Sequence, residues 1–214
     1  REHPSMKAPP SSELNELDAL VEQTRGVQPF RRLFHAFTGT AVAVALTWLG
    51  LPRATAVTIL GVVLVGQIAL DVVRLRMPRA NAAFFRAFRH LASPREAEGL
   101  ASSTWYTVGL LLAVALFPGQ AAISGILVLA LSDPAASYVG QRWGRRPLLG
   151  GSVAGSVAFV VVGLAVLLPR HAAPVALGAT VAGLLAERLS WPLDDNLALP
   201  PATAAAITLL EWAL

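Results

Sequence analysis

Residues 123–146 read ISGILVLALSDPAASYVGQRWGRR, an apolar run that ends at Asp133 and continues into small residues and arginines. An unpaired carboxylate is costly in hydrocarbon, so one in this setting needs a partner, a cation or water. The glycines allow a backbone to approach a ligand closely, and Arg142, Arg145 and Arg146 offer fixed positive charge that suits phosphate. The stretch therefore predicts a phosphate-handling site at a membrane surface.

The composition around this stretch is that of an integral membrane protein. The chain has 214 residues, of which 55% are hydrophobic and only 14% are charged. A soluble domain carries about 25% charged residues, and here the apolar residues come in long blocks. The chain has no cysteine, which excludes disulfides, a thiolate nucleophile and cysteine-ligated zinc.

Hydropathy divides the chain into a polar tail, residues 1–29, and a membrane-embedded domain, residues 30–214. We expect an all-α polytopic fold with about seven transmembrane helices. In the tail, Ser11–Thr24 has the spacing of an amphipathic helix, although an unfolded tail is an equal alternative. Pro118-Gly119, Pro169 and Pro200-Pro201 are expected to mark turns or helix starts. The predicted spans are Leu33–Leu51, Ala54–Val73, Thr104–Phe117, Ala121–Val139, Val153–Leu168, Ala172–Leu185 and Ala198–Leu214.

The basic residues predict the orientation. With seven spans, 15 of the 17 Lys and Arg residues fall on one side, and only Arg53 and Arg170 fall on the other. By the positive-inside rule the N-terminus is cytoplasmic and the C-terminus is outside, most simply in the inner membrane. The basic character therefore reflects sidedness and gives no reason to expect nucleic acid as a partner. The oligomeric state stays open, with a homo-oligomer among the alternatives.

The polar clusters of interest all fall on the cytoplasmic side, and each has a structural alternative. Arg31 and Arg32 suit a topology anchor, Asp71 suits an ion pair with Arg74, and Glu96 and Glu98 suit neutralisation of nearby arginines. His35 could cap or pair within the bundle. Asp133-Pro134 and Asp194-Asp195-Asn196 both resemble helix caps. Together, however, the carboxylates suit oxygen ligands for Mg²⁺ beside a polyphosphate.

The order of these motifs resembles a known family. Arg-Arg-Leu-Phe-His at 31–35, Asp-Pro-Ala-Ala-Ser-Tyr-Val-Gly at 133–140, Gly155-Ser156 and a late Glu followed by Asp-Asp-Asn-Leu are similar to the phytol kinase, dolichol kinase and CTP-dependent diacylglycerol kinase family, which is related to phosphatidate cytidylyltransferases. The resemblance implies a helical membrane enzyme that uses CTP, or ATP, to phosphorylate the hydroxyl of a membrane lipid. Its partners would be the nucleotide, the lipid substrate and the bilayer.

The resemblance assigns roles to the candidate residues. Mg²⁺ ligands would come from Asp133, Glu187, Asp194 and Asp195, and His35, Asp133 or Glu98 would serve catalysis. The nucleotide phosphates would contact Arg32, Arg142, Arg145, Arg146 and Asn196, together with the helix start at Ser152, Gly155 and Ser156.

One departure qualifies the resemblance. Where the family shows Lys-Ser-x-Glu-Gly-Ser, this chain has Gly151 and Ala154 in place of the lysine and the glutamate. Arg145 or Arg146 would then have to supply the missing cation. Two alternatives follow: a cytidylyltransferase that acts on a lipid phosphate, and a transporter or other non-catalytic membrane protein derived from this family.

Overall fold

The computed structural model describes residues 11–25, 29–189 and 194–214 and confirms the all-helical fold. Two segments that the sequence analysis used lie outside the described residues. One is residues 1–10, which contain Arg1 and Lys7, and the other is residues 190–193, between Glu187 and Asp194. Two short strands, β1 Pro147–Leu148 and β2 Gly151–Ser152, pair in a small hairpin that the sequence analysis did not predict. The elements are α1 Ser11–Gln23, α2 Pro29–Thr47, α3 Arg53–Arg76, α4 Pro78–Ala87, the 3-10 helix η1 Pro94–Ala97, α5 Ser102–Leu116, α6 Gly119–Trp143, β1 Pro147–Leu148, β2 Gly151–Ser152, α7 Val153–Leu167, α8 Ala173–Leu189 and α9 Asp195–Ala213.

Each of the seven predicted apolar segments forms a helix: α2, α3 and α5 to α9. By length and composition, α3 and α6 could each cross a membrane, while α5 and α7 are shorter apolar helices. Ile59, Val62 and Val65 of α3 leave at least half of their surface exposed. The number of spans remains a prediction.

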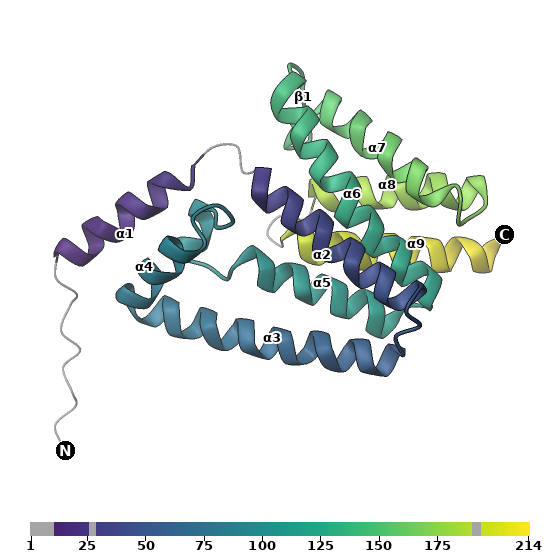
Figure 1. Cartoon of the computed structure of the whole chain (residues 1–214). Coiled ribbons are helices and arrows are strands. Elements are labelled where there is room, and N and C mark those ends of the chain that lie inside the picture. Colours follow the sequence, from purple (N-terminus) through teal and green to yellow (C-terminus); the bar gives the residue numbers. More distant parts are fainter. Residues whose placement is uncertain (1–10, 26–28, 190–193) are drawn as a thin grey trace.

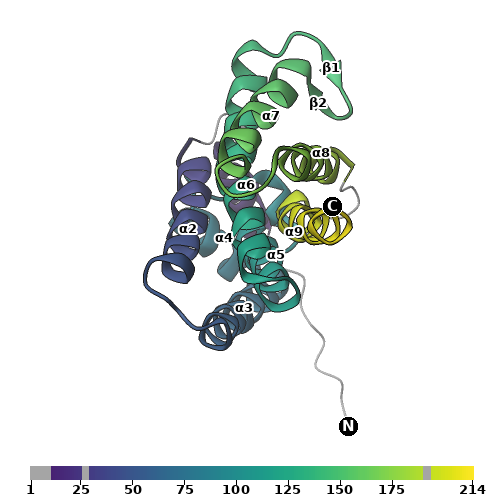
Figure 2. The ribbon, with the colours of Figure 1, turned by 90° about the vertical axis from the view of Figure 1, so that its right-hand side faces the viewer.

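Helix α6 lies in the middle of the bundle. It packs against α7, α9 and α2, and Figures 1 and 2 show α2 on one side of it and α8 and α9 on another. Helix α5 packs against α9 and α3, so α3 lies at the edge of the bundle. This arrangement brings the ends of α6 and α8 and the beginnings of α2, α7 and α9 together, where the site is found.

Two glycines let α9 approach its neighbours closely. A Cβ on Gly109 of α5 would overlap the backbone carbonyl of Asn196, and one on Gly125 of α6 would overlap the carbonyl of Pro200. The expectation that Pro200-Pro201 mark a helix start is wrong, because α9 begins at Asp195 and runs through both prolines. Prolines lack the amide that would bond four residues back, which leaves carbonyls near the start of α9 without their helical donors.

The tail contains the amphipathic helix that the sequence predicted. Leu17, Leu20 and Val21 of α1 are partly buried, whereas Glu16 and Glu22 are exposed. Helix α1 packs against α4, an additional amphipathic helix that the sequence did not predict. The unfolded-tail alternative therefore does not hold for Ser11–Gln23.

A buried polar network joins α3, α4, η1 and the start of α5. As predicted, Asp71 pairs with Arg74, whose Nε lies 2.6 Å from Asp71 Oδ1. Arg74 also donates to Asn81 Oδ1 at 3.1 Å and to the carbonyls of Glu96 and Gly99 at 2.5 and 2.6 Å. Asp71 Oδ2 in turn accepts from Thr104 Oγ1 at 2.7 Å and from the amide of Ala101 at 3.1 Å. Buried charges are tolerated when each has partners, and this network meets that condition.

A second polar cluster closes the opposite end of the bundle. His171 Nε2 lies 2.8 Å from Ser124 Oγ, and His171 Nδ1 lies 2.7 Å from Glu211 Oε1. The spacing resembles a catalytic Ser-His-acid arrangement, but Ser124 is fully buried and lines none of the cavities found in the described residues. The cluster therefore ties α6, the α7–α8 turn and α9 together.

Candidate active site

A polar cavity of about 210 Å³ lies between α2, α6 and the start of α9. We call it the central cavity. It brings together five of the predicted site residues, which lie far apart in the sequence: two from α2, one from α6 and two from the start of α9. It is lined by Arg31, Arg32, His35, Asp133, Ser137, Gln141, Asp195 and Asn196.

A second cavity of about 500 Å³, here called the arginine cavity, adjoins the first between α6, the hairpin and α8. Asp133, Ser137, Gln141 and Asp195 line both cavities. The arginine cavity adds three guanidinium groups, four glycines and one more carboxylate. Its further lining includes Gly140, Gly144, Arg145, Arg146, Gly150, Gly151, Ser152, Glu187 and Arg188.

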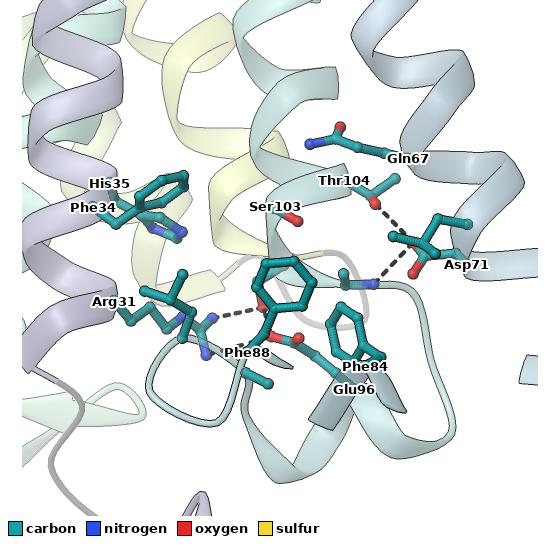
Figure 3. Close-up of a pocket in the computed structure, with 15 residues that line it drawn as sticks. Arg31, Phe34, His35, Gln67, Asp71, Phe84, Phe88, Glu96, Ser103 and Thr104 are labelled. Carbon is teal, nitrogen blue, oxygen red and sulfur yellow. Dashed lines mark hydrogen bonds and ion pairs between the residues drawn. The ribbon is translucent and has the colours of Figure 1, made fainter. Parts of the chain in front are cut away.

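A third cavity, of about 240 Å³, is mostly apolar and lies between α2, α3, α4 and the start of α5. Figure 3 shows Phe34, Phe84 and Phe88 around it, with Arg31 and Glu96 along one side. We call it the apolar pocket. Arg31 and His35 line both the apolar pocket and the central cavity. The three cavities therefore form a series, from apolar through polar to arginine-rich.

The two arginines at the start of α2 make tertiary contacts in opposite directions. Arg31 Nη2 donates to Ser102 Oγ at 2.6 Å, and Arg31 Nη1 lies 3.7 Å from Glu96 Oε1. Arg32 Nε donates to Ser137 Oγ of α6 at 3.1 Å. Both side chains thus help to define the walls of the site, a role beyond that of a topology anchor.

Asp133 lies inside α6, since the helix continues through Pro134 to Trp143. The helix-cap alternative for Asp133-Pro134 is therefore wrong. His35 is buried, and its ring packs on that of Tyr106 with 4.6 Å between centroids. Its backbone carbonyl accepts from Tyr106 Oη at 2.7 Å, which fixes this turn of α2 beside the central cavity.

The acidic residues before α9 divide into a cap and a cavity residue. Asp194 is the N-cap, and its Oδ1 accepts from the amide of Asn196 at 3.1 Å and from Asn196 Nδ2 at 2.6 Å. The cap interpretation therefore holds for Asp194, whereas Asp195 lines both the central and the arginine cavities. Asn196 is buried and also lines the central cavity.

Glu187 and Asp195 lie outside the predicted spans and share an unfavourable environment for negative charge. Burial, followed by the negative charge of Asp195, raises the pKa of Glu187 to about 7, against the opposing effect of Arg188. Burial, followed by the charges of Asp133 and Asp194, raises the pKa of Asp195 to about 7. A bound cation would relieve this repulsion.

The carboxylates suit Mg²⁺ only if substrate completes the coordination. Among the described residues, no three His, Asp or Glu side chains are grouped closely enough to hold an ion by themselves. Mg²⁺ is commonly bound through one or two carboxylates, with the remaining ligands from phosphates and water. Asp133, Glu187 and Asp195 border one cavity and fit that pattern. Asp194 fits it less well, because it lines neither the central cavity nor the arginine cavity.

The predicted helix start forms as expected. Ser152 is the N-cap of α7, and its Oγ accepts from the amide of Gly155 at 3.1 Å. Ser156 Oγ donates to the carbonyl of Ser152 at 3.1 Å, so this hydroxyl is used within the helix. The preceding hairpin turns at Leu149 and Gly150, both of which have the positive φ that a type I′ two-residue hairpin loop requires.

Four predicted site residues line none of the cavities found among the described residues: Gly155 and Ser156, which are buried at the start of α7, and Glu98 and Arg142. Glu98 and Arg142 are both exposed, and in the described part of the chain they line neither the three cavities above nor a fourth one beside η1. Glu96, two residues before Glu98, is buried instead and accepts from Ser102 Oγ at 2.9 Å.

Four residues of the site were not predicted: Arg31 as a lining residue, Ser137, Gln141 and Arg188. The first three lie within motifs that the sequence had already marked. Ser137 follows Asp133 by four residues, which places both on the same face of a helix, so its place in the site could have been predicted. Arg188 gave no such signal, because only the folded chain brings it to the hairpin.

Comparison with known proteins yields relatives in three fungi, each named CTP-dependent diacylglycerol kinase 1. The Eremothecium gossypii protein is 34% identical over 98 residues, which cover 44% of this chain and 31% of that protein. The Schizosaccharomyces pombe protein is 26% identical over 161 residues, which cover 65% of this chain and 74% of that protein. The Saccharomyces cerevisiae protein is 29% identical over 98 residues, which cover 44% and 34% of the two chains.

The matched region thus spans only about a third of the length of the Eremothecium and Saccharomyces relatives. No family model matches the chain, and no solved structure does. The three named relatives nevertheless agree with the resemblance drawn from the motifs. The resemblance of this chain to the CTP-dependent diacylglycerol kinase family, drawn first from its motifs, is therefore supported by three relatives of that name.

Proposed function

We propose that the chain is a CTP-dependent kinase that phosphorylates the hydroxyl of a membrane lipid, with diacylglycerol as the first candidate substrate. The observation that carries this proposal is the series of three cavities with shared walls. An apolar pocket suits the chains of a lipid, and an arginine-rich cavity suits a triphosphate. The two meet at the central cavity, where His35 and Asp133 lie. The names of the three relatives support both substrates.

The chain's own residues would act mainly by positioning and by neutralising charge. Arg145, Arg146 and the start of α7 would hold the triphosphate, and His35 or Asp133 would accept the proton of the lipid hydroxyl. The hydroxyl oxygen forms a bond to the γ-phosphorus, the bond from that phosphorus to the β-phosphate oxygen breaks, and CDP leaves. Mg²⁺, held by Asp133, Glu187 and Asp195, would offset the negative charge of the phosphates.

We further propose that the seven apolar helices span the bilayer with the N-terminus in the cytoplasm. The exposed apolar surface of α3 supports this arrangement, because so much of it would be unfavourable in water. The site then lies at the cytoplasmic face, where nucleotide is available. Lipid would enter the apolar pocket from the side of the bilayer.

The test is a product analysis with purified protein, labelled CTP or ATP, and diacylglycerol, phytol or a polyprenol. A kinase releases CDP and forms a lipid phosphate. Release of pyrophosphate from CTP, with transfer of CMP to an added lipid phosphate, would instead identify a cytidylyltransferase. Absence of any nucleotide turnover, with folded protein and each of the three lipids, would contradict the proposal and favour a non-catalytic membrane protein.

A further inference from the structure

Arg188, in the last turn of α8, points into the arginine cavity at the hairpin. Its side chain is 10% exposed, and its Nε lies 2.8 Å from Glu187 Oε2. The rest of the guanidinium lies over the backbone of Gly151, where an added Cβ would overlap Nη1. A Cβ on Gly155 would lie 3.3 Å from Nη2. The guanidinium therefore occupies the volume that a side chain at position 151 would fill.

The guanidiniums at this position are arranged to bind an anion. Arg188 lies beside the N-terminus of α7, which carries partial positive charge from its free amides. Arg145 and Arg146 line the same cavity. Among the described residues Arg188 pairs with Glu187, and Asp133 and Asp195 also line this cavity, so three guanidiniums and a helix start lie beside three carboxylates in one polar space. Polyphosphate oxygens would pair with the guanidiniums, and the Mg²⁺ of a nucleotide complex would pair with the carboxylates.

We propose that Arg188 is a phosphate-binding residue of this site and supplies, from α8, the cation that the family resemblance expects from a lysine at position 151. This inference rests on the proposed function for its nucleotide, but binding of a polyphosphate tests it separately. It also explains why position 151 is glycine. Gly151 does not have positive φ, so its backbone does not require glycine, whereas the guanidinium of Arg188 does.

The geometry distinguishes Arg188 from the two arginines that the sequence suggested. Arg145 and Arg146 are exposed, whereas the Arg188 side chain is nine-tenths buried and held by Glu187. A fixed cation in a partly desolvated site interacts with phosphate more strongly than one in water. Arg188 should therefore contribute more to binding than either exposed arginine.

The experiment measures binding of CTP and of inorganic tripolyphosphate to the full chain in detergent, by isothermal titration calorimetry. The variants are Arg188→Gln, Gly151→Ala, Gly151→Lys and the double variant Arg188→Gln/Gly151→Lys. Arg76→Gln and Gly66→Ala are matched controls, because Arg76 is exposed outside the cavities and a Cβ on Gly66 meets nothing within 4 Å. Thermal unfolding of each variant confirms that it is folded.

Arg188→Gln should weaken binding of both ligands about 10- to 100-fold, the range for losing a charge-assisted hydrogen bond pair. Gly151→Ala should do the same without removing any charge, because its Cβ displaces the guanidinium. Gly151→Lys alone should also weaken binding, and the double variant should recover at least tenfold over Arg188→Gln. The controls should stay within twofold of the parent.

Binding within twofold of the parent in both Arg188→Gln and Gly151→Ala would overturn the inference. So would tighter binding by Gly151→Lys alone, or failure of the parent to bind tripolyphosphate. If Arg188→Gln does not fold, Gly151→Ala decides the question. Loss of tripolyphosphate binding in the variants supports the inference even when the parent protein shows no kinase activity. The binding result and the kinase result can therefore fail independently of each other.

Discussion

Replacement of Arg74 by methionine should destabilise the protein more than any change on the surface of α3. Arg74 is 1% exposed and donates four charge-assisted contacts, to Asp71, to Asn81 and to two backbone carbonyls. Methionine fills a similar volume but donates nothing, so the Asp71 carboxylate keeps only Thr104 and one amide as partners. Removing one partner of a buried ion pair costs about 3–5 kcal/mol.

The assay is denaturant or thermal unfolding of purified protein in detergent, with Arg76→Met as the control. Arg76 lies on the same helix and is exposed, so its loss should change the unfolding free energy by less than about 0.5 kcal/mol. The double variant Asp71→Asn/Arg74→Met should cost less than the sum of the single variants, because it leaves no unpaired charge. An Arg74→Met variant within about 1 kcal/mol of the parent would refute the argument that this network holds α3, α4 and α5 together.

Three further predictions concern the site and its orientation. Asp133→Asn should lower Mg²⁺-dependent CTP turnover by at least about 100-fold with little change in the unfolding temperature, and near-normal turnover would exclude Asp133 from the site. Because the pKa values of Glu187 and Asp195 are raised to about 7 from unfolded values near 4, their contribution to stability is present below about pH 4 and lost as the pH rises through 7. Unfolding temperature of the ligand-free protein should accordingly fall between pH 5 and 8, and Mg²⁺ with CTP should bind more tightly at pH 8 than at pH 6; the opposite trends would contradict the assignment. A reporter fused after Leu214 should read as outside the cytoplasm, and a cytoplasmic signal would mean that a span has been miscounted.

The helices were predictable because their signal is local. Continuous apolar runs gave the positions of α2, α3 and α5 to α9 within a few residues, and the Ser152 cap gave the start of α7. Helix α4 was missed because it is short and carries Arg79 and Arg86, so its composition is that of a polar connection. The position of the prolines in α9 was predicted wrongly because the rule that places prolines at helix starts uses local sequence alone. It takes no account of the close packing of α9 against glycines of α5 and α6.

The sequence predicted which residues of the site lie at the same end of the helix bundle, but not which of them enter the cavities. Placing the polar clusters at one end of the bundle was enough to bring His35, Asp133 and Asp195 to one cavity. Which of two nearby acids enters the site was not accessible in this way. Glu96 is buried and Glu98 is exposed because Arg31 and Ser102, from other helices, contact the former.

Gly151 and Arg188 should behave as alternatives rather than as independent positions. A side chain at 151 and the guanidinium of Arg188 need the same volume beside the start of α7. Two cations there would also repel each other across a partly desolvated space, which adds an electrostatic cost to the steric one. A chain with lysine at the position of Gly151 should therefore have a small or neutral residue at the position of Arg188. With the proposed role of Arg188, the glycine at position 151 is compatible with phosphate binding, because the cation would come from α8 instead of the hairpin.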